Sequence, residues 1–167
     1  MKIKNIIFCT SLFLSILSCG VYSFTGGDTG SAKTIQINYF PNNAPLVEPG
    51  LSQALTQALQ DLFLRQTNLS LVKSNGDLFF EGEITNYRVT PMTATADQAA
   101  AQSRLTVVVN VRFYNKTDES KDFEKSFTHF SDFDALDQLS GAVLDNALEE
   151  IFDRITQDIF NASVANW

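Results

Sequence analysis

Cysteine and histidine are nearly absent from this 167-residue chain. The two cysteines, Cys9 and Cys19, both lie near the start, and His129 is the single histidine. Everything after residue 19 therefore lacks a thiol, which excludes a disulfide framework, a cysteine zinc cluster and a thiol nucleophile there. A Ser-His-Asp triad could be built only around His129, whose place near a predicted strand end favours a structural or exposed histidine.

Basic residues are also scarce, with 12 lysines and arginines against 19 aspartates and glutamates. Removal of the first 18 residues would leave ten basic and nineteen acidic residues, a net charge of −9. A non-specific nucleic-acid binder needs a basic face, so no nucleic-acid partner is expected. The sequence also lacks a phosphate loop, a dinucleotide fingerprint and metal-ligand spacing, so neither a cofactor nor a metal is expected.

No apolar run is long enough to span a bilayer, which takes roughly 20 residues. The N-terminus instead has the parts of a secretory signal, with Lys2 and Lys4 before a mostly apolar run over residues 6–17. The residues that follow, Ile-Leu-Ser-Cys over 16–19, resemble the bacterial lipobox. We therefore expect residues 1–18 to be a lipoprotein signal peptide and Cys19 to carry acyl chains on its thiol and its new amino group. Two or more chains would anchor the protein stably. The alternative is a plain secretory signal that is cut elsewhere.

Residues 19–33 are rich in glycine and small polar residues, which suits a lipidated N-terminus and flexible tether. The apolar residues Val21, Tyr22 and Phe24 interrupt this stretch. They would either dip into the headgroup region or pack on a partner, or else belong to the first strand of the domain. Residues 34–167 are expected to form one domain.

Hydrophobic periodicity within 34–167 changes between the strand period of two and the helical period of 3.6. The predicted strands are residues 34–40, 69–72, 78–89, 105–113 and 123–130, and the predicted helices are residues 51–68 and the stretch from 135 onward. Residues 74–77 read Ser-Asn-Gly-Asp and indicate a hairpin. The alternation slips near Asn86, which predicts a bulge, and residues 91–103 have the composition of an exposed loop. The order β-α-β-β-β-β-α predicts an α+β single domain in which two helices pack on one face of a mainly antiparallel four- to five-stranded sheet.

No catalytic constellation stands out among these elements. Glu81 and Glu83 share one face of a predicted strand, which suits either a pair of catalytic carboxylates or ordinary exposed sheet charge. Aromatic residues are the more suggestive feature. Phe79, Tyr87, Tyr114 and Phe130 cannot all share the main apolar face of their strands, so they line either an exposed surface for a partner or a second small core.

Four stretches together resemble the LptE lipoproteins, in the form seen in Bacteroidota. They are residues 19–26 (CGVYSFTG), 34–47 (TIQINYFPNNAPLV), 76–84 (GDLFFEGEI) and 164–167 (VANW). With the order of strands and helices, the resemblance extends over essentially all of the chain after residue 18.

The resemblance implies a non-enzymatic role in the last step of lipopolysaccharide transport. Proteins of this family plug the lumen of the outer-membrane β-barrel LptD, help it to fold and bind lipopolysaccharide. The expected location is the outer membrane, on its periplasmic side, held through acylated Cys19. Arg88 and Arg104, at the two ends of the predicted 91–103 loop, are the candidates for binding lipopolysaccharide by their charge and position. Two other readings stay open: a periplasmic binding or scaffold lipoprotein with an unrelated partner, and a hydrolase that uses Glu81 or Glu83.

Overall fold

The computed structural model describes residues 27–92 and 101–165. Its elements follow one another in the predicted order β-α-β-β-β-β-α, with one added turn of 3-10 helix. They are β1 (Thr34–Ile37), α2 (Leu51–Gln66), β2 (Ser70–Leu71), β3 (Leu78–Met92), β4 (Gln102–Asn115), η2 (Glu119–Lys121), β5 (Phe123–Asp134) and α3 (Ala142–Val164). The predicted fold class, two helices on a mainly antiparallel sheet, is confirmed.

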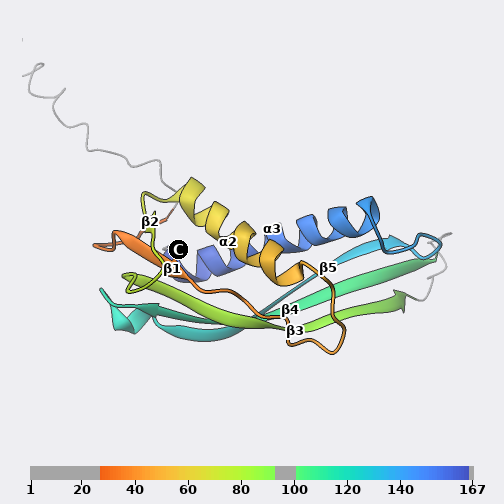
Figure 1. The fold of residues 1–167 in the computed structure, drawn as a ribbon, viewed down its shortest axis with the longest axis horizontal. Helices are drawn as coiled ribbons and strands as arrows, with labels where there is room; N and C mark the ends of the chain where they lie inside the picture. Colours follow the sequence, from red (N-terminus) through yellow and green to blue (C-terminus); the bar gives the residue numbers. More distant parts are fainter. Residues whose placement is uncertain (1–26, 93–100, 166–167) are drawn as a thin grey trace, which may run out of the picture.

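The five strands form one mixed sheet in the order β2-β1-β3-β4-β5 (Figure 1). The long pairs, β3 with β4 and β4 with β5, are antiparallel, whereas β1 runs parallel to both β2 and β3. The predicted hairpin at residues 74–77 is therefore wrong, because β1 lies between β2 and β3. In β1, Ile35 is fully buried and Ile37 is largely buried, whereas both residues of β2 are exposed. The strand β1 is therefore the neighbour of β3 that buries apolar surface.

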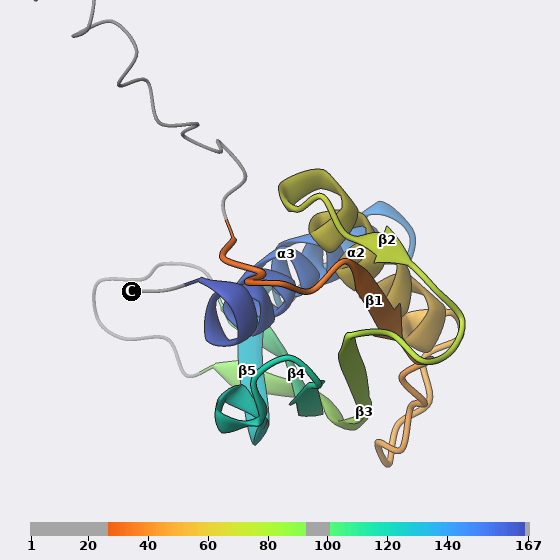
Figure 2. The ribbon, with the colours of Figure 1, turned by 90° about the vertical axis from the view of Figure 1, so that its left-hand side faces the viewer.

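Alternation along the central strands directs one set of side chains to the helices. Leu78, Phe80 and Ile84 of β3 are fully buried, as are the odd-numbered residues 105–113 of β4. Both α-helices cover this inner face, and among the described residues no α-helix covers the other face of the sheet (Figure 2). The core between the layers is aromatic, with ring centroids 5.0 Å apart for Phe63 and Phe80 and 5.1 Å apart for Phe63 and Phe160.

The predicted bulge near Asn86 is confirmed as a shift in the pairing of β3 with β4 between Ile84 and Asn86. One extra residue reverses the direction in which later side chains point. Tyr87 is consequently turned inward and is only 4% exposed, so it does not belong to the exposed aromatic surface considered from the sequence. Burial, together with the neighbouring Glu48 carboxylate, raises the pKa of the Tyr87 phenol to about 12.

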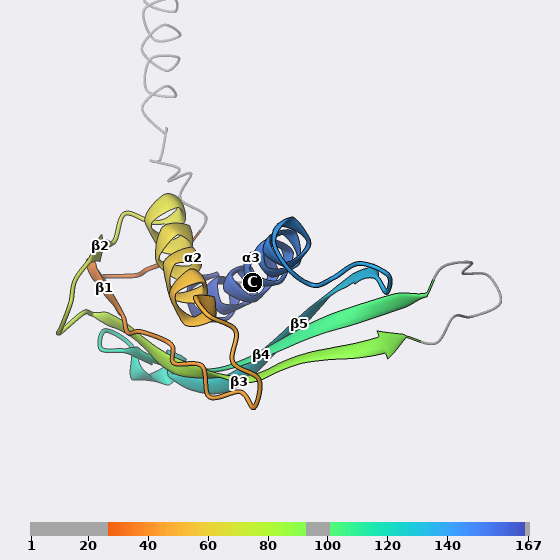
Figure 3. The same ribbon diagram turned by 45° about the vertical axis from the view of Figure 1, so that its right-hand side comes forward.

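The strands extend further than the sequence predicts. Residues 91–92 and 102–103 belong to paired strands and not to the predicted loop, and residues 93–100 lie outside the described residues. The last helix begins at Ala142 rather than at Ala135, because residues 134–140 form turns in which the Asp134 carboxylate accepts a hydrogen bond from the Leu136 amide. The ends of β3 and β4 consequently project past the helices (Figure 3).

Residues 27–33, the described part of the predicted tether, lie against the domain. The Asp28 amide donates to the Val164 carbonyl at the end of α3, and Ala32 is buried in the core. No helix within residues 27–92 and 101–165 combines the length and apolar character needed to cross a membrane.

Candidate functional site

Arg88 and Arg104 lie on the face of the sheet that the helices leave open, here called the open face. Arg88 of β3 pairs with Thr106 of β4, and Arg104 of β4 pairs with Thr90 of β3. Residues directly opposite one another, and residues two apart on a strand, share a face. The two arginines are therefore diagonal neighbours near the projecting end of the β3-β4 pair, as their places beside the predicted loop suggested.

Their side chains have different environments. The Arg104 Nε and Nη2 atoms donate hydrogen bonds of 2.7 and 2.8 Å to the two carboxylate oxygens of Asp132 on β5. The same guanidinium lies 3.6 Å from the centre of the Phe130 ring. The hydrogen bonds to Arg104 hold the pKa of the Asp132 carboxyl below its usual value and raise the pKa of Arg104. Arg88 is exposed, and no ion pair in the described part of the chain involves it.

A second charge cluster occupies the middle of the open face around Arg112. Its Nε atom is 3.0 Å from Glu81 Oε1, and its Nη2 atom is 3.3 Å from Glu83 Oε2. Asn110 donates to both Glu83 and Glu124, which extends the cluster from β3 to β5. Hydrogen bonds to Glu81 and then Glu83 raise the pKa of the Arg112 guanidinium. Arg112 thus bridges Glu81 and Glu83. This pairing favours the reading of the two glutamates as ordinary charged residues on a sheet surface.

Three aromatic residues, Phe79, Tyr114 and Phe130, lie toward the two ends of the open face. Phe79 and Tyr114, opposite one another on β3 and β4, stack with ring centroids 5.7 Å apart and an angle of 17° between their planes. Tyr114 and Phe130 are both exposed. Three of the four aromatic residues identified from the sequence therefore lie on this face, and they are separated by the charged cluster.

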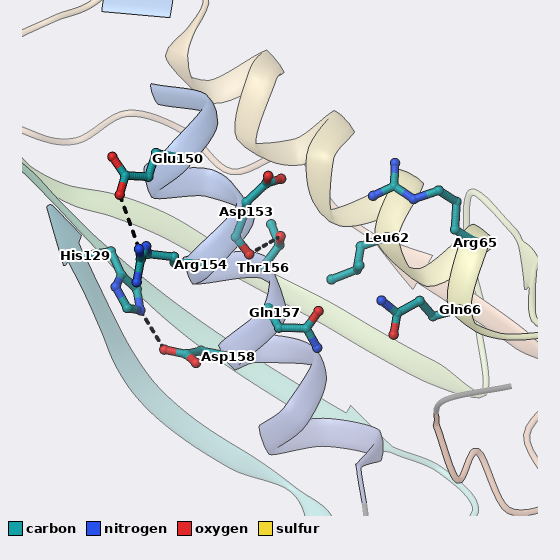
Figure 4. A pocket seen from close by; sticks show the side chains of 10 residues that line it. All are labelled: Leu62, Arg65, Gln66, His129, Glu150, Asp153, Arg154, Thr156, Gln157 and Asp158. Carbon is teal, nitrogen blue, oxygen red and sulfur yellow. Dashed lines mark hydrogen bonds and ion pairs between the residues drawn. The ribbon is translucent and has the colours of Figure 1, made fainter. Parts of the chain in front are cut away.

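An open groove of about 660 Å³ runs along α3 on the opposite side of the sheet (Figure 4). Its lining comes from α2, β5 and α3: Leu62, Arg65, Gln66, His129, Glu150, Asp153, Arg154, Thr156, Gln157 and Asp158. Sequence reasoning did not find this groove because its walls come from three separate segments, and only His129 carried a signal.

The ionisable groups of the groove are largely paired with one another. His129 Nε2 is 2.7 Å from Asp158 Oδ2, and Arg154 Nη2 is 3.3 Å from Glu150 Oε1. Glu150 also accepts a 2.7 Å hydrogen bond from Ser131 on β5. The only hydroxyl among its lining residues, that of Thr156, donates to the Asp153 carbonyl. These contacts join the edge strand β5 to α3.

The described fold coincides with the region matched by a protein-family model. The LptE model, described as lipopolysaccharide-assembly, matches residues 32–163, from the buried Ala32 to the last turn of α3. The chain belongs to the LptE family. The family identity of the domain is thereby confirmed. A comparison with curated proteins finds no match.

Solved structures with similar folds share little sequence with this LptE-family chain. The hypothetical protein CT253 from Chlamydia trachomatis gives a TM-score of 0.54 at 11% identity, covering 81% of this chain and 100% of that one. Protein XCC0632 from Xanthomonas campestris gives 0.53 at 12% identity, covering 80% and 84%. The PelC dodecamer from Paraburkholderia phytofirmans gives 0.50 at 12% identity, covering 84% and 95%. At these identities the likeness shows the fold alone.

Proposed function

We propose that this LptE-family protein is an outer-membrane lipoprotein that occupies the lumen of an LptD-like β-barrel. There it assists assembly of the barrel and delivery of lipopolysaccharide to the cell surface. The observation that carries the proposal is the family match, because it spans the whole packed domain from β1 to α3 and not one motif. The role is non-enzymatic, and Glu81 and Glu83, held by Arg112, fit that role.

The chemistry of the open face supports a place inside a barrel. Transmembrane barrels have polar interiors, so a plug needs a polar surface. The middle of the open face carries the cluster around Arg112 and Asn110, whose carboxylates are hydrogen-bonded across three strands. Such a polar and net negative face suits polar or basic lumen residues, whereas burying it against apolar surface would be costly.

The projecting end of the β3-β4 pair is the part of the domain suited to lipopolysaccharide. Arginine binds phosphate oxygens through its planar fork of donors. Arg88 is exposed there, and Arg104 presents the other side of its guanidinium from a fixed position over Phe130. We propose Arg88 as the first contact for a phosphate group, with Arg104 as a positioned neighbour.

The anchor completes the proposal. Acylated Cys19 would hold the protein in the inner leaflet of the outer membrane, on its periplasmic side. Gly27, where the described fold begins, is eight residues after Cys19, so the domain can lie at most about 28 Å from its anchor. That reach keeps the domain at the periplasmic mouth of a neighbouring barrel.

Gentle detergent extraction of a protein tagged after Trp167, followed by mass spectrometry, tests the proposal. We expect recovery of one large β-barrel protein in near-equal amount. A Cys19→Ala variant should lose membrane retention and most of the barrel. Failure of the acylated protein to recover any barrel would contradict the proposal, and recovery with peptidoglycan or a soluble partner would favour a scaffold lipoprotein.

A pair of matched variants tests which face contacts the barrel. Val108→Arg places a charge and bulk on the open face, whereas Leu64→Arg makes the same change on the exposed side of α2. We expect Val108→Arg to reduce barrel recovery much more than Leu64→Arg. Equal recovery with both variants would remove the open face as the contact surface.

A further inference from the structure

The strand β5 (Phe123–Asp134) lies at one edge of the sheet, next to β4 and farthest from β2 (Figure 2). Among the described residues no strand pairs with its outer side. The edge is 12 residues long, and its pairing with β4 runs from Phe123 to Asp134 without a register shift. A regular edge strand presents a row of backbone groups on which another chain can form a further strand.

The hydrogen-bond pattern identifies the backbone groups that face outward. Phe80 and Ile84 of β3 make backbone hydrogen bonds of 2.8 to 2.9 Å with the chain on the β1 side. Directions alternate along an antiparallel pair, so their partners on β4, Phe113 and Val109, point their own backbone groups toward β5. The odd-numbered residues of β5 are thereby bonded to β4, and the even-numbered residues over 124–132 direct their N–H and C=O groups outward.

The other edges of the sheet are shortened or interrupted. The strand β2 has only two residues, and the part of β3 beyond Ile84 contains the bulge and Pro91. Such features discourage pairing with another chain, as do charged side chains on an edge strand. The central residues of β5, Ser-Phe-Thr-His-Phe-Ser over 126–131, include no proline, lysine or acidic residue. The middle of β5 therefore lacks the features that keep an edge strand from pairing.

A groove beside β5 leaves room for an added strand. Its volume is about 450 Å³. Four consecutive residues of β5 line one side of it: Lys125, Ser126, Phe127 and Thr128. Successive side chains of a strand point to opposite faces, so a groove that touches all four follows the edge of the strand. Across it lie Asp158, Asn161 and Ala162 of α3, so the facing wall is made of short side chains.

The two sides of the β5 edge differ in polarity. On the helix side, an added strand would meet Lys125 and the polar residues Asp158 and Asn161. On the open face it would lie beside Thr128 and the ring of Phe130, which is 45% exposed. A strand with polar side chains on one face and apolar side chains on the other therefore fits both sides of the edge.

We propose that β5 pairs with a strand of the LptD-like barrel while that barrel is still open, and so serves as a template for its assembly. This inference rests on the proposed function, which supplies the partner. Transmembrane strands alternate apolar and polar side chains over about 9–11 residues, which suits both the two-sided edge and the 12 residues of β5. An unclosed barrel has a free edge of its own, and pairing with β5 satisfies the backbone groups of both edges until the barrel closes.

Hydrogen exchange at single amides tests the pairing directly. The acylated full-length protein is mixed with the urea-unfolded barrel recovered by the detergent extraction, and the mixture is diluted into micelles so that the barrel folds. Deuterium pulses, quenching and NMR then report on the amides of β5. We expect the outward amides of Ser126, Thr128 and Phe130 to exchange at least about tenfold more slowly with the barrel present. The amides of Phe127 and His129, which are bonded to β4, should not change.

Proline at residue 128 tests whether the outward backbone donor matters. Thr128→Pro removes the outward N–H and no bond to β4, whereas Thr128→Ala changes the side chain alone and is the matched control. Thr128→Pro should slow folding of the barrel about fivefold, as the loss of one hydrogen bond would, and Thr128→Ala should leave the rate nearly unchanged. The heat-modifiable mobility of a folded barrel on a gel measures the rate, and circular dichroism reports whether both variants are folded.

The outcomes separate this inference from the proposed function. A barrel that binds the parent protein but leaves exchange at the outward amides unchanged would overturn the template role and keep the barrel as partner. Failure of the parent protein to bind the barrel would contradict both. Slow exchange that appears without the barrel and grows with protein concentration would overturn the inference, because a second copy would then occupy the edge. If Thr128→Pro does not fold, the exchange data on the parent protein decide alone.

Discussion

Arg104 on β4 and Asp132 on β5 form a bidentate ion pair, with hydrogen bonds of 2.7 and 2.8 Å across adjacent strands. The pair fixes one of the two arginines that the sequence singled out for lipopolysaccharide. The other, Arg88, lies diagonally across β3 and β4 and has no such partner among the described residues. The two candidate residues therefore differ in how freely they can bind a phosphate group.

This difference predicts unequal effects on lipopolysaccharide binding. Arg88→Gln should weaken binding about threefold, because it removes an exposed charge that is available to the ligand. The double variant Arg104→Gln with Asp132→Asn keeps the net charge and a polar side chain at both positions, and should change binding less than about twofold. Titration of the purified protein with labelled lipopolysaccharide measures both. A larger loss of binding in the double variant than in Arg88→Gln would assign the phosphate contact to Arg104.

The cluster on the open face predicts a stability effect at Arg112. Arg112→Met would leave Glu81 and Glu83 on the same face without their shared cation, and like charges at that spacing repel. We expect the melting temperature at neutral pH to fall by a few degrees. Adding Glu81→Gln and Glu83→Gln should restore most of the loss. Circular dichroism during heating provides the measurement, and a single variant as stable as the parent would show that the cluster contributes nothing.

The close approach of β3 and β4 at Gly82 predicts intolerance of any side chain. A Cβ at this position would meet the Asn110 carbonyl oxygen and lie 2.7 Å from the Phe40 ring. Gly82→Ala should lower the free energy of unfolding by about 1–3 kcal/mol, as overpacking in a close-packed core does. Urea denaturation, with Thr128→Ala on the exposed side of β5 as the control, measures the difference. Equal midpoints for the two variants would mean that the strands separate easily there.

The buried phenol of Tyr87 predicts a loss of stability at high pH. Its pKa is raised to about 12, mainly by burial and then by Glu48, so folding favours the protonated form. This contribution is fully present below the ordinary tyrosine pKa of about 10 and is lost as pH rises from there through about 12. Tyr87→Phe should therefore show a smaller fall in stability over that range.

The titration can be followed by the ultraviolet absorbance of phenolate. Glu48→Gln should lower the Tyr87 pKa only in part, because burial is the larger cause. A midpoint near 10 in the folded protein would contradict the buried position of Tyr87.

Local patterns were sufficient for most of the fold. The helical spacing of apolar residues located α2, and the period of two located β3, β4 and β5, because one side of each element must be buried. The slip at Asn86 located the bulge, since one extra residue changes the phase of the alternation. Resemblance in sequence supplied the family before any geometry was known, and the model match over residues 32–163 bears it out.

Other features depend on residues that are distant in the sequence. Thr34 and Asp77 join the start of β1 to the start of β3, so β1 lies beside β3 although the local turn signal indicated a hairpin between β2 and β3. The extended ends of β3, β4 and β5 arise from pairing, which orders polar residues that have weak strand preferences alone.

The sequence by itself determined the class of the fold, its family and the scarcity of basic residues, because these follow from composition and local period. Only the tertiary structure decided that Arg104 is paired while Arg88 is exposed, and that β5 is the long strand at the edge of the sheet. The reason is physical: pairing and clustering depend on distances across the sheet, and those distances are set by strand register and not by position along the chain.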